Sequence, residues 1–229
     1  MVSLEFVHDK NRDIKNIWET ANFSHPWEHS MKKTSGLYQW KDRSYEDCYL
    51  EIKDHVLGFH SSEVLPIFLN CLRDSWSLIN DDYFNKLRKI TDSEIYTDKF
   101  TAYLTIAGRC PYSTEDDSFM VSTRRPIFQN LRTCGHELLH LQMEKTHLPQ
   151  IREDLDFRET EYVNESLTEI LNLECKDLWL VNDFGYDEHQ ILREMIHSWW
   201  KNHKDIGTVI ENCITYVLYN RDNLPFLDV

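Results

Sequence analysis

The spacing of apolar residues changes along the chain from helical to alternating and back to helical. Between Val56 and Asn80, apolar side chains recur every three or four residues, which predicts helix, and a shorter helix is expected over about residues 82–90. In residues 99–108, KFTAYLTIAG, apolar and polar positions alternate as in a half-buried strand. Residues 118–122, SFMVS, are predicted to form a second strand that pairs antiparallel with the first.

Helical spacing returns in the second half of the chain. Helices are expected over about residues 126–146, 154–182, 187–203 and 208–220. Pro126 suits the first turn of the first of these helices, and Pro149 prevents its continuation. The second is expected to end near Gly185, and Gly207 separates the last two.

These elements predict an α+β fold that is mainly α, with a helical N-terminal region, a short antiparallel strand pair and a helical core. The length of 229 residues suits one large domain or two small ones. We therefore divide the chain into a mostly helical region, residues 1–95, and a second region, residues 96–229. One continuous domain is the alternative.

The glycines exclude several enzyme classes. There are six of them, and no two lie within 20 residues of each other. The dinucleotide-binding GxGxxG, the phosphate-binding GxxxxGK and the nucleophile elbow GxSxG each need closely spaced glycines. The chain therefore has none of these three motifs.

The net charge and the cysteines indicate which partners and which cellular compartment to expect. The chain has 25 Lys and Arg against 39 Asp and Glu, a net charge of −14, and no basic run longer than two residues, so no nucleic-acid partner is expected. No stretch approaches the roughly 18 apolar residues of a membrane span, and the start of the chain has no secretory signal pattern. Six scattered cysteines without a CxxC pair favour a reduced, cytoplasmic protein. The oligomeric state is left open.

The helix expected over residues 126–146 contains His136-Glu137-Leu138-Leu139-His140. Residues four apart share one face of a helix, so both imidazoles can bind the same ion. Glu137 is rotated by about 100° from His136, which suits a base that contacts a water rather than a third ligand. Two histidine ligands beside a carboxylate base are typical of a zinc hydrolase.

The next long helix offers a third ligand. Catalytic zinc usually has three protein ligands and an open fourth position. Asn164-Glu165-Ser166-Leu167-Thr168-Glu169 begins 24 residues after His140, and two antiparallel helices would bring Glu165 opposite the two histidines. Glu169, one turn further on, is expected to accept the N–H of a ligand histidine and fix its tautomer.

HELLH followed by NESLTE resembles the gluzincin, or thermolysin-like, zinc metallopeptidases. The resemblance covers about residues 99–182 and implies a zincin-like catalytic region. It implies His136, His140 and Glu165 as zinc ligands, Glu137 as general base and Glu169 as partner of a ligand. SFMVS resembles the edge strand that holds an extended peptide beside the metal in these folds.

Three features depart from the family pattern or leave its roles open. Glu169 stands where these enzymes more often have Asp, and no GxMEN-like segment precedes HELLH, which disfavours the aminopeptidase branch. The donor that stabilises the transition state is not assigned by the motif; His189, His197 and Tyr186 are the candidates.

The sequence thus predicts a cytoplasmic zinc-dependent peptidase that acts on a peptide or protein substrate, with Glu137 as general base. One alternative is another metal-dependent amide hydrolase, such as a peptide deformylase, although Cys110 lies in Gly-Arg-Cys-Pro rather than in the Gly-Cys-Leu-Ser type of segment of that family. The other is a non-enzymatic regulatory or binding protein in which the metal staples two helices.

Overall fold

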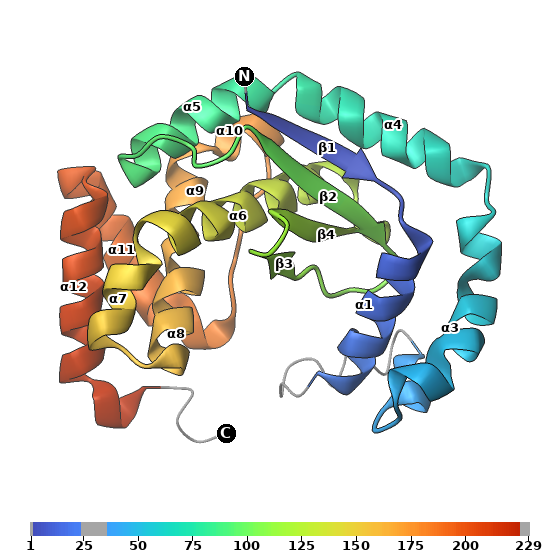
Figure 1. The fold of residues 1–229 in the computed structure, drawn as a ribbon. Helices are drawn as coiled ribbons and strands as arrows, with labels where there is room; N and C mark the ends of the chain where they lie inside the picture. The colour runs from blue at the N-terminus through green and yellow to red at the C-terminus, as the bar shows by residue number, and fades with distance from the viewer. Residues whose placement is uncertain (1, 24–35, 225–229) are drawn as a thin grey trace. The chain divides into compact units, whose positions relative to one another are not determined.

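The structure is a computed structural model that describes residues 2–23 and 36–224 (Figure 1). These residues are mainly helical with one small sheet, so the predicted class, α+β and mainly α, is confirmed. None of the described helices combines the length and apolar character that crossing a bilayer requires.

Two compact units make up the described chain, and each is assembled from separated stretches. The sheet unit contains the described parts of residues 3–78 together with residues 99–131. The helical unit contains Val2 and the described parts of residues 79–98 and 132–229. The chain passes from one unit to the other after residues 2, 78, 98 and 131.

The sheet unit is built on four strands. They are β1 (Ser3–Val7), β2 (Lys99–Thr105), β3 (Tyr112–Ser113) and β4 (Ser118–Ser122), in the spatial order β1-β2-β4-β3. β1 pairs parallel with β2, and β3 pairs antiparallel with β4. Phe100, Ala102 and Leu104 of β2 are buried and alternate with more exposed neighbours, as predicted for a half-buried strand.

The predicted antiparallel pairing of the strands at 99–108 and 118–122 is wrong, because β2 and β4 run parallel. Thr101 lies opposite Ser118, and Thr105 lies opposite Ser122. The connection after β2 first forms β3 on the far side of β4, so the tight antiparallel turn joins β3 to β4 instead. β4 therefore has a neighbour on both sides and is not the edge strand that the resemblance implied.

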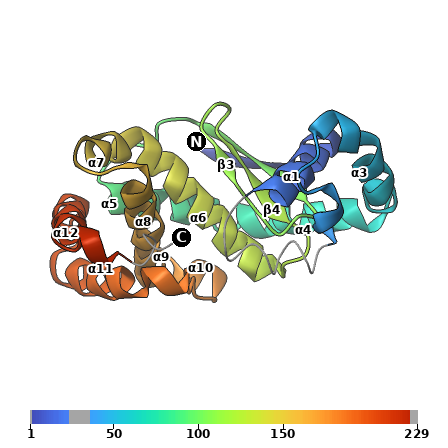
Figure 2. The same ribbon diagram turned by 90° about the horizontal axis from the view of Figure 1, so that it is seen from below.

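Helices α1 (Lys10–Asn22), α3 (Tyr45–His60) and α4 (Val64–Ser77), with the short 3-10 helix η1 (Leu37–Trp40), complete the sheet unit. α1 and α3 lie side by side (Figure 2) and bury a common core that includes Ile14, Ile17, Trp40 and Ile52. The helix expected over residues 56–80 is divided between α3 and α4, because the Ser61 and Ser62 hydroxyls bond to nearby backbone at the junction.

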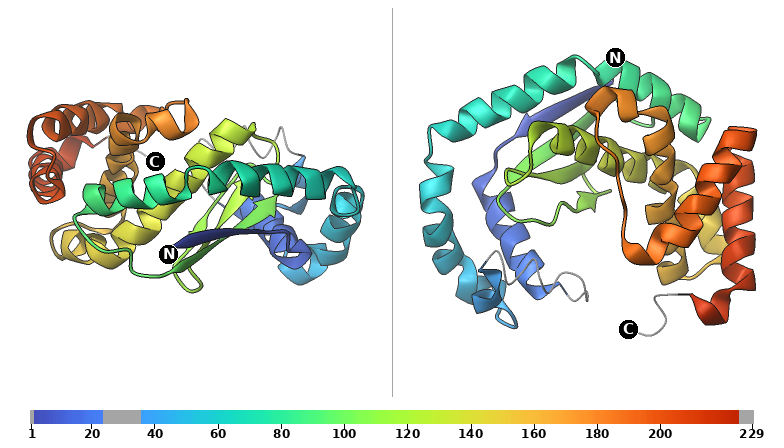
Figure 3. Two further views of the ribbon diagram at one scale, coloured as in Figure 1. Left: turned by 90° about the horizontal axis from the view of Figure 1, so that it is seen from above. Right: turned by 180° about the vertical axis from the view of Figure 1, so that it is seen from behind.

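The helical unit holds most of the second half of the chain. Its helices are α5 (Asn80–Thr91), α6 (Ile127–Thr146, from Arg132 onward), α7 (Leu148–Asp154), α8 (Phe157–Leu167), α9 (Glu169–Glu174), α10 (Lys176–Trp179), α11 (Gln190–His203) and α12 (Ile206–Tyr219), with 3-10 turns η2 (Asp187–His189) and η3 (Arg221–Asn223). α11 packs against α8, α9 and α12, and Figure 3 shows α11 beside α12.

Two helix predictions in this unit need correction. The long helix expected over residues 154–182 is three shorter helices, α8 to α10, and it ends at Leu180 in the left-handed conformation rather than near Gly185. At the first break the Thr168 hydroxyl donates to the Glu165 carbonyl, a local bond that competes with helix continuation. The break between α11 and α12 lies at Lys204 and Asp205, and Gly207 is already inside α12.

The segment of α6 that carries HELLH is held by a close approach at Gly135. A Cβ atom at this position would lie 2.5 Å from Cη2 of Trp179 in α10, closer than real carbon atoms approach. The Tyr83 hydroxyl of α5 donates to the Gly135 carbonyl oxygen at 2.7 Å. Only glycine therefore lets α5 and α10 pack this tightly against the helix turn that begins the motif.

Gly135→Ala is expected to lower the free energy of unfolding by about 1–3 kcal/mol, because the added methyl group displaces the buried Trp179 ring. Thermal unfolding followed by circular dichroism measures the change. Gly58→Ala is the control: nothing lies within 4 Å of the added carbon on α3, and alanine favours helix by about 1 kcal/mol. Equal melting temperatures for Gly135→Ala and the wild type would contradict the close packing.

Candidate metal centre

His136 and His140 lie one turn apart on the same face of α6, as the motif predicts. Their ring centroids are 4.5 Å apart and the rings are nearly perpendicular. The two Nε2 atoms face each other at 2.9 Å. The helix alone therefore brings two nitrogen donors to one point.

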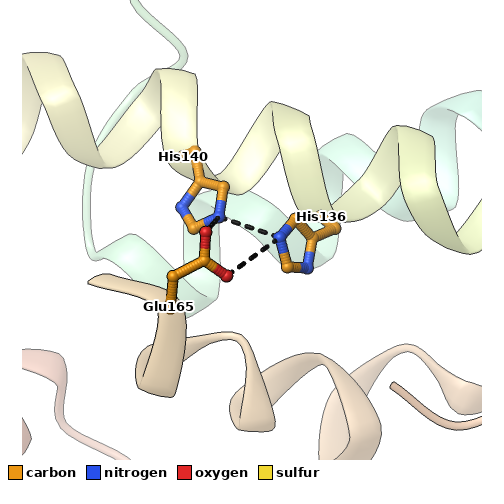
Figure 4. Close-up of side chains that lie close together, drawn as sticks. All are labelled: His136, His140 and Glu165. Atoms are coloured by element: carbon orange, nitrogen blue, oxygen red, sulfur yellow. Dashed lines mark hydrogen bonds and ion pairs between the residues drawn. The ribbon is translucent and has the colours of Figure 1, made fainter. Parts of the chain in front are cut away.

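Glu165 of α8 contributes an oxygen donor to the same point (Figure 4). Oε2 of Glu165 lies 3.5 Å from His136 Nε2, and Oε1 lies 3.5 Å from His140 Nε2. Tetrahedral donors bound at about 2.0–2.1 Å to zinc are about 3.4 Å apart. The donor atoms of the three residues all lie within 4.8 Å of one another, so the group can hold a metal ion.

The local sequence explains where Glu165 is placed. Asp156 begins α8 with a capping box, in which its side chain accepts from Glu159 N and the Glu159 side chain accepts from Asp156 N. This fixes the start of the helix, and α8 then packs on α11 through a buried face. Glu165 lies on the side of α8 that faces the two histidines.

The carboxylate of Asp183, to which no sequence motif points, contacts the other ring nitrogen of His136. Its Oδ2 lies 2.7 Å from His136 Nδ1, and its Oδ1 lies 2.7 Å from Nη1 of Arg132 and accepts from Gly185 N. Because a carboxylate can only accept, the neutral His136 ring carries its proton on Nδ1, and Nε2 then has the lone pair that could bind a metal. Arg132 precedes His136 by one turn of α6.

Glu169, expected beside a ligand histidine, has other partners in the structure. Its Oε2 accepts from Arg193 at 2.9 Å and from Asn172 at 2.8 Å, and its Oε1 lies 2.9 Å from Nδ1 of His197. The interruption of the helix at Thr168 separates Glu169 from the regular spacing on which the expectation rested. Asp183 takes the place beside His136 instead.

Glu137, the predicted base, is 8% exposed and follows His136 directly on α6. It lies close enough to His140 to help raise the pKa of that ring. Two of the candidate donors, His189 and Tyr186, are in an aromatic cluster: the His189 ring contacts Tyr162 at 5.3 Å and Tyr186 at 5.4 Å. Among the described residues, neither these two nor His197 belongs to the group of possible metal ligands.

The electrostatics of the three donors favour positive charge between them. Burial lowers the pKa of His136, but the carboxylates of Asp183 and Glu165 outweigh burial and raise the pKa to about 10. Burial raises the pKa of Glu165, but the two histidines hold it well below its usual value. A proton or a divalent cation can supply this charge, and the two compete for the same atoms.

The sequence points to Arg132 and Asp183 to different degrees. Arg132 carries a signal in the sequence, since it lies four residues before His136 on the same helix face. Asp183 lies in an irregular segment after α10, where no periodicity relates it to the motif.

Comparison of the chain with protein-family models, curated proteins and solved structures gives no match.

Asp183→Asn is expected to weaken zinc binding about 10- to 100-fold, because the amide holds the His136 N–H less strongly and lowers the basicity of the ring. Competition with a chromophoric chelator measures the affinity. Asp177→Asn is the matched control, since its side chain is 67% exposed and pairs with Lys86. Equal zinc affinity in Asp183→Asn and the wild type would show that the contact with His136 does not support metal binding.

Proposed function

We propose that the protein is a zinc-dependent peptidase of the gluzincin type. The observation that carries the proposal is the convergence of His136 Nε2, His140 Nε2 and a Glu165 carboxylate oxygen, with Glu137 next to His136 on the same helix. Two imidazoles and one carboxylate are the ligand set of several zinc peptidases. The group contains no cysteine, which favours this function over the deformylase alternative with its cysteine ligand.

In this function His136, His140 and Glu165 hold the ion, and Asp183 fixes the orientation of the His136 ring. A bound zinc ion supplies Lewis acidity toward a water and a carbonyl oxygen. Glu137 takes the proton of the attacking water and delivers it to the nitrogen of the leaving amine. The amide bond is thereby exchanged for a carboxylate and an amine.

The substrate in this proposal is a peptide or protein, and the compartment is the cytoplasm. All six cysteines are free thiols, and Cys48, Cys134, Cys175 and Cys213 are buried. Free thiols of this kind suit a reducing compartment. Neither nucleic acid nor a membrane is part of the proposed function.

Metal content tests the ligands. Elemental mass spectrometry of the wild type is expected to give about one zinc per chain, and Glu165→Ala should lose most of it after dialysis, because two histidines alone hold zinc weakly. Glu211→Ala, on the exposed face of α12, is the control and should retain zinc. A wild type that stays free of metal after incubation with zinc would exclude the proposed centre.

Glu137→Gln distinguishes a catalytic zinc site from a structural one that only joins two helices. The variant is expected to retain zinc and to cleave peptides about 100- to 10,000-fold more slowly, because glutamine cannot take up the proton. A library of fluorogenic peptides reports cleavage, and Glu211→Gln should cleave as the wild type does. A wild type that binds zinc but cleaves no peptide would instead favour the regulatory or binding protein in which zinc joins α6 and α8.

A further inference from the structure

The guanidinium of Arg193, on α11, lies at the centre of a hydrogen-bond network behind the metal ligands. The residue is only 2% exposed. Burying a charged group is costly unless each donor finds an acceptor in good geometry. The acceptors of Arg193 therefore show which parts of the chain this side chain holds together.

These acceptors lie on two segments that are not adjacent in the sequence. Arg193 Nη1 donates to Oγ1 of Thr168 at 2.6 Å, at the break between α8 and α9, and Nη2 donates to Oε2 of Glu169 at 2.9 Å. Nη2 also donates to the backbone carbonyl of Asp183 at 2.7 Å. One side chain thus joins the end of the helix that carries Glu165 to the segment that carries Asp183.

The segment around Asp183 has no regular structure of its own. It runs between Leu180 and Gly185, both with a φ of 62°. Asn172 of α9 adds two bonds, because its Oδ1 accepts from Asp183 N and its Nδ2 donates to Asp183 O, each at 2.7 Å. A side chain at Gly185 would begin 2.9 Å from Cδ and Nε of Arg193, so the segment lies directly on the arginine.

We infer that Arg193 is a positioning residue of the metal centre, which sets the place of the Asp183 carboxylate and, through it, the orientation of the His136 ring. The inference rests on the proposed metal centre and concerns the supporting side chains rather than the ligands. Lysine would keep the charge but not the planar fork, which here reaches Thr168, Glu169 and Asp183 at once. A change of Arg193 to lysine therefore separates geometry from charge.

A pocket of about 370 Å³ borders the same network and is lined by Glu169, Asp183, Arg193 and His197, among others. The pocket gives small solutes access to the space that a shortened side chain would leave. Guanidinium ion added to an Arg193→Ala variant can therefore enter the position of the missing group. Ammonium, which lacks the planar fork, is the matched control solute.

The test is a double-mutant cycle of zinc affinity with Arg193→Lys, Asp183→Asn and the combined variant, using zinc alone as the probe. Arg193→Lys is expected to weaken zinc binding about 10-fold. In the Asp183→Asn background the same change should cost less than about 2-fold, because no carboxylate remains to be positioned. Arg88→Lys is the control, since Arg88 of α5 pairs with the exposed side chain of Glu94 and should leave the affinity unchanged.

Two further readouts distinguish positioning from a general loss of stability. The visible spectrum of the cobalt-substituted protein should change in Arg193→Lys and not in Arg88→Lys. Guanidinium but not ammonium should restore zinc affinity to Arg193→Ala. Unchanged affinity and spectrum in Arg193→Lys, or an equal loss in both backgrounds, would overturn the inference. A wild type that binds no zinc would overturn the metal centre as well, whereas a zinc-binding protein without peptidase activity leaves the role of Arg193 standing.

Discussion

The contact between Asp183 and Nδ1 of His136 determines which atom His136 turns toward the candidate metal centre. A carboxylate accepts but cannot donate, so this 2.7 Å contact keeps the proton of the neutral ring on Nδ1 and turns Nε2 toward His140 and Glu165. Without a fixed acceptor the ring could rotate or carry its proton on the other nitrogen. Arg132 bonds to this carboxylate, and Arg193 and Asn172 bond to the backbone of Asp183, so together they hold the acceptor in place.

The charges around the centre are arranged so that one carboxylate is left for the ion. Arg132 faces Asp183 and Arg193 faces Glu169, so both arginines are matched to carboxylates. The side chain of Glu165 has only the two histidines as ion-pair partners among the described residues. Its negative charge can therefore be balanced by protons on the imidazoles or by a divalent cation between the three side chains, and the two compete for the same atoms.

What the sequence predicts correctly depends on interactions that are close along the chain. The two histidines follow from helix periodicity, and Glu165 follows from a second motif on the next long helical segment. The parallel pairing of β2 with β4 could not be predicted in this way. Alternation of apolar and polar residues indicates which side chains of a strand are buried, but not the direction of the strand, and the short β3 reverses the chain between β2 and β4. The position of Asp183 is still harder to predict from the sequence, since it depends on hydrogen bonds to Asn172 and Arg193.

The breaks in the helix that was predicted over residues 154–182 allow Asp183 to reach His136. Asp183 follows Glu165 by 18 residues, and along a continuous helix that separation is about 27 Å. Asp183 could not then contact a histidine that also faces Glu165. The breaks at Thr168, Cys175 and Leu180 let the chain return to α6. Arg193 bonds to Glu165 O before the first break, to Glu169 after it and to Asp183. The departures from helical periodicity in this segment are therefore what brings the carboxylate to the ligand.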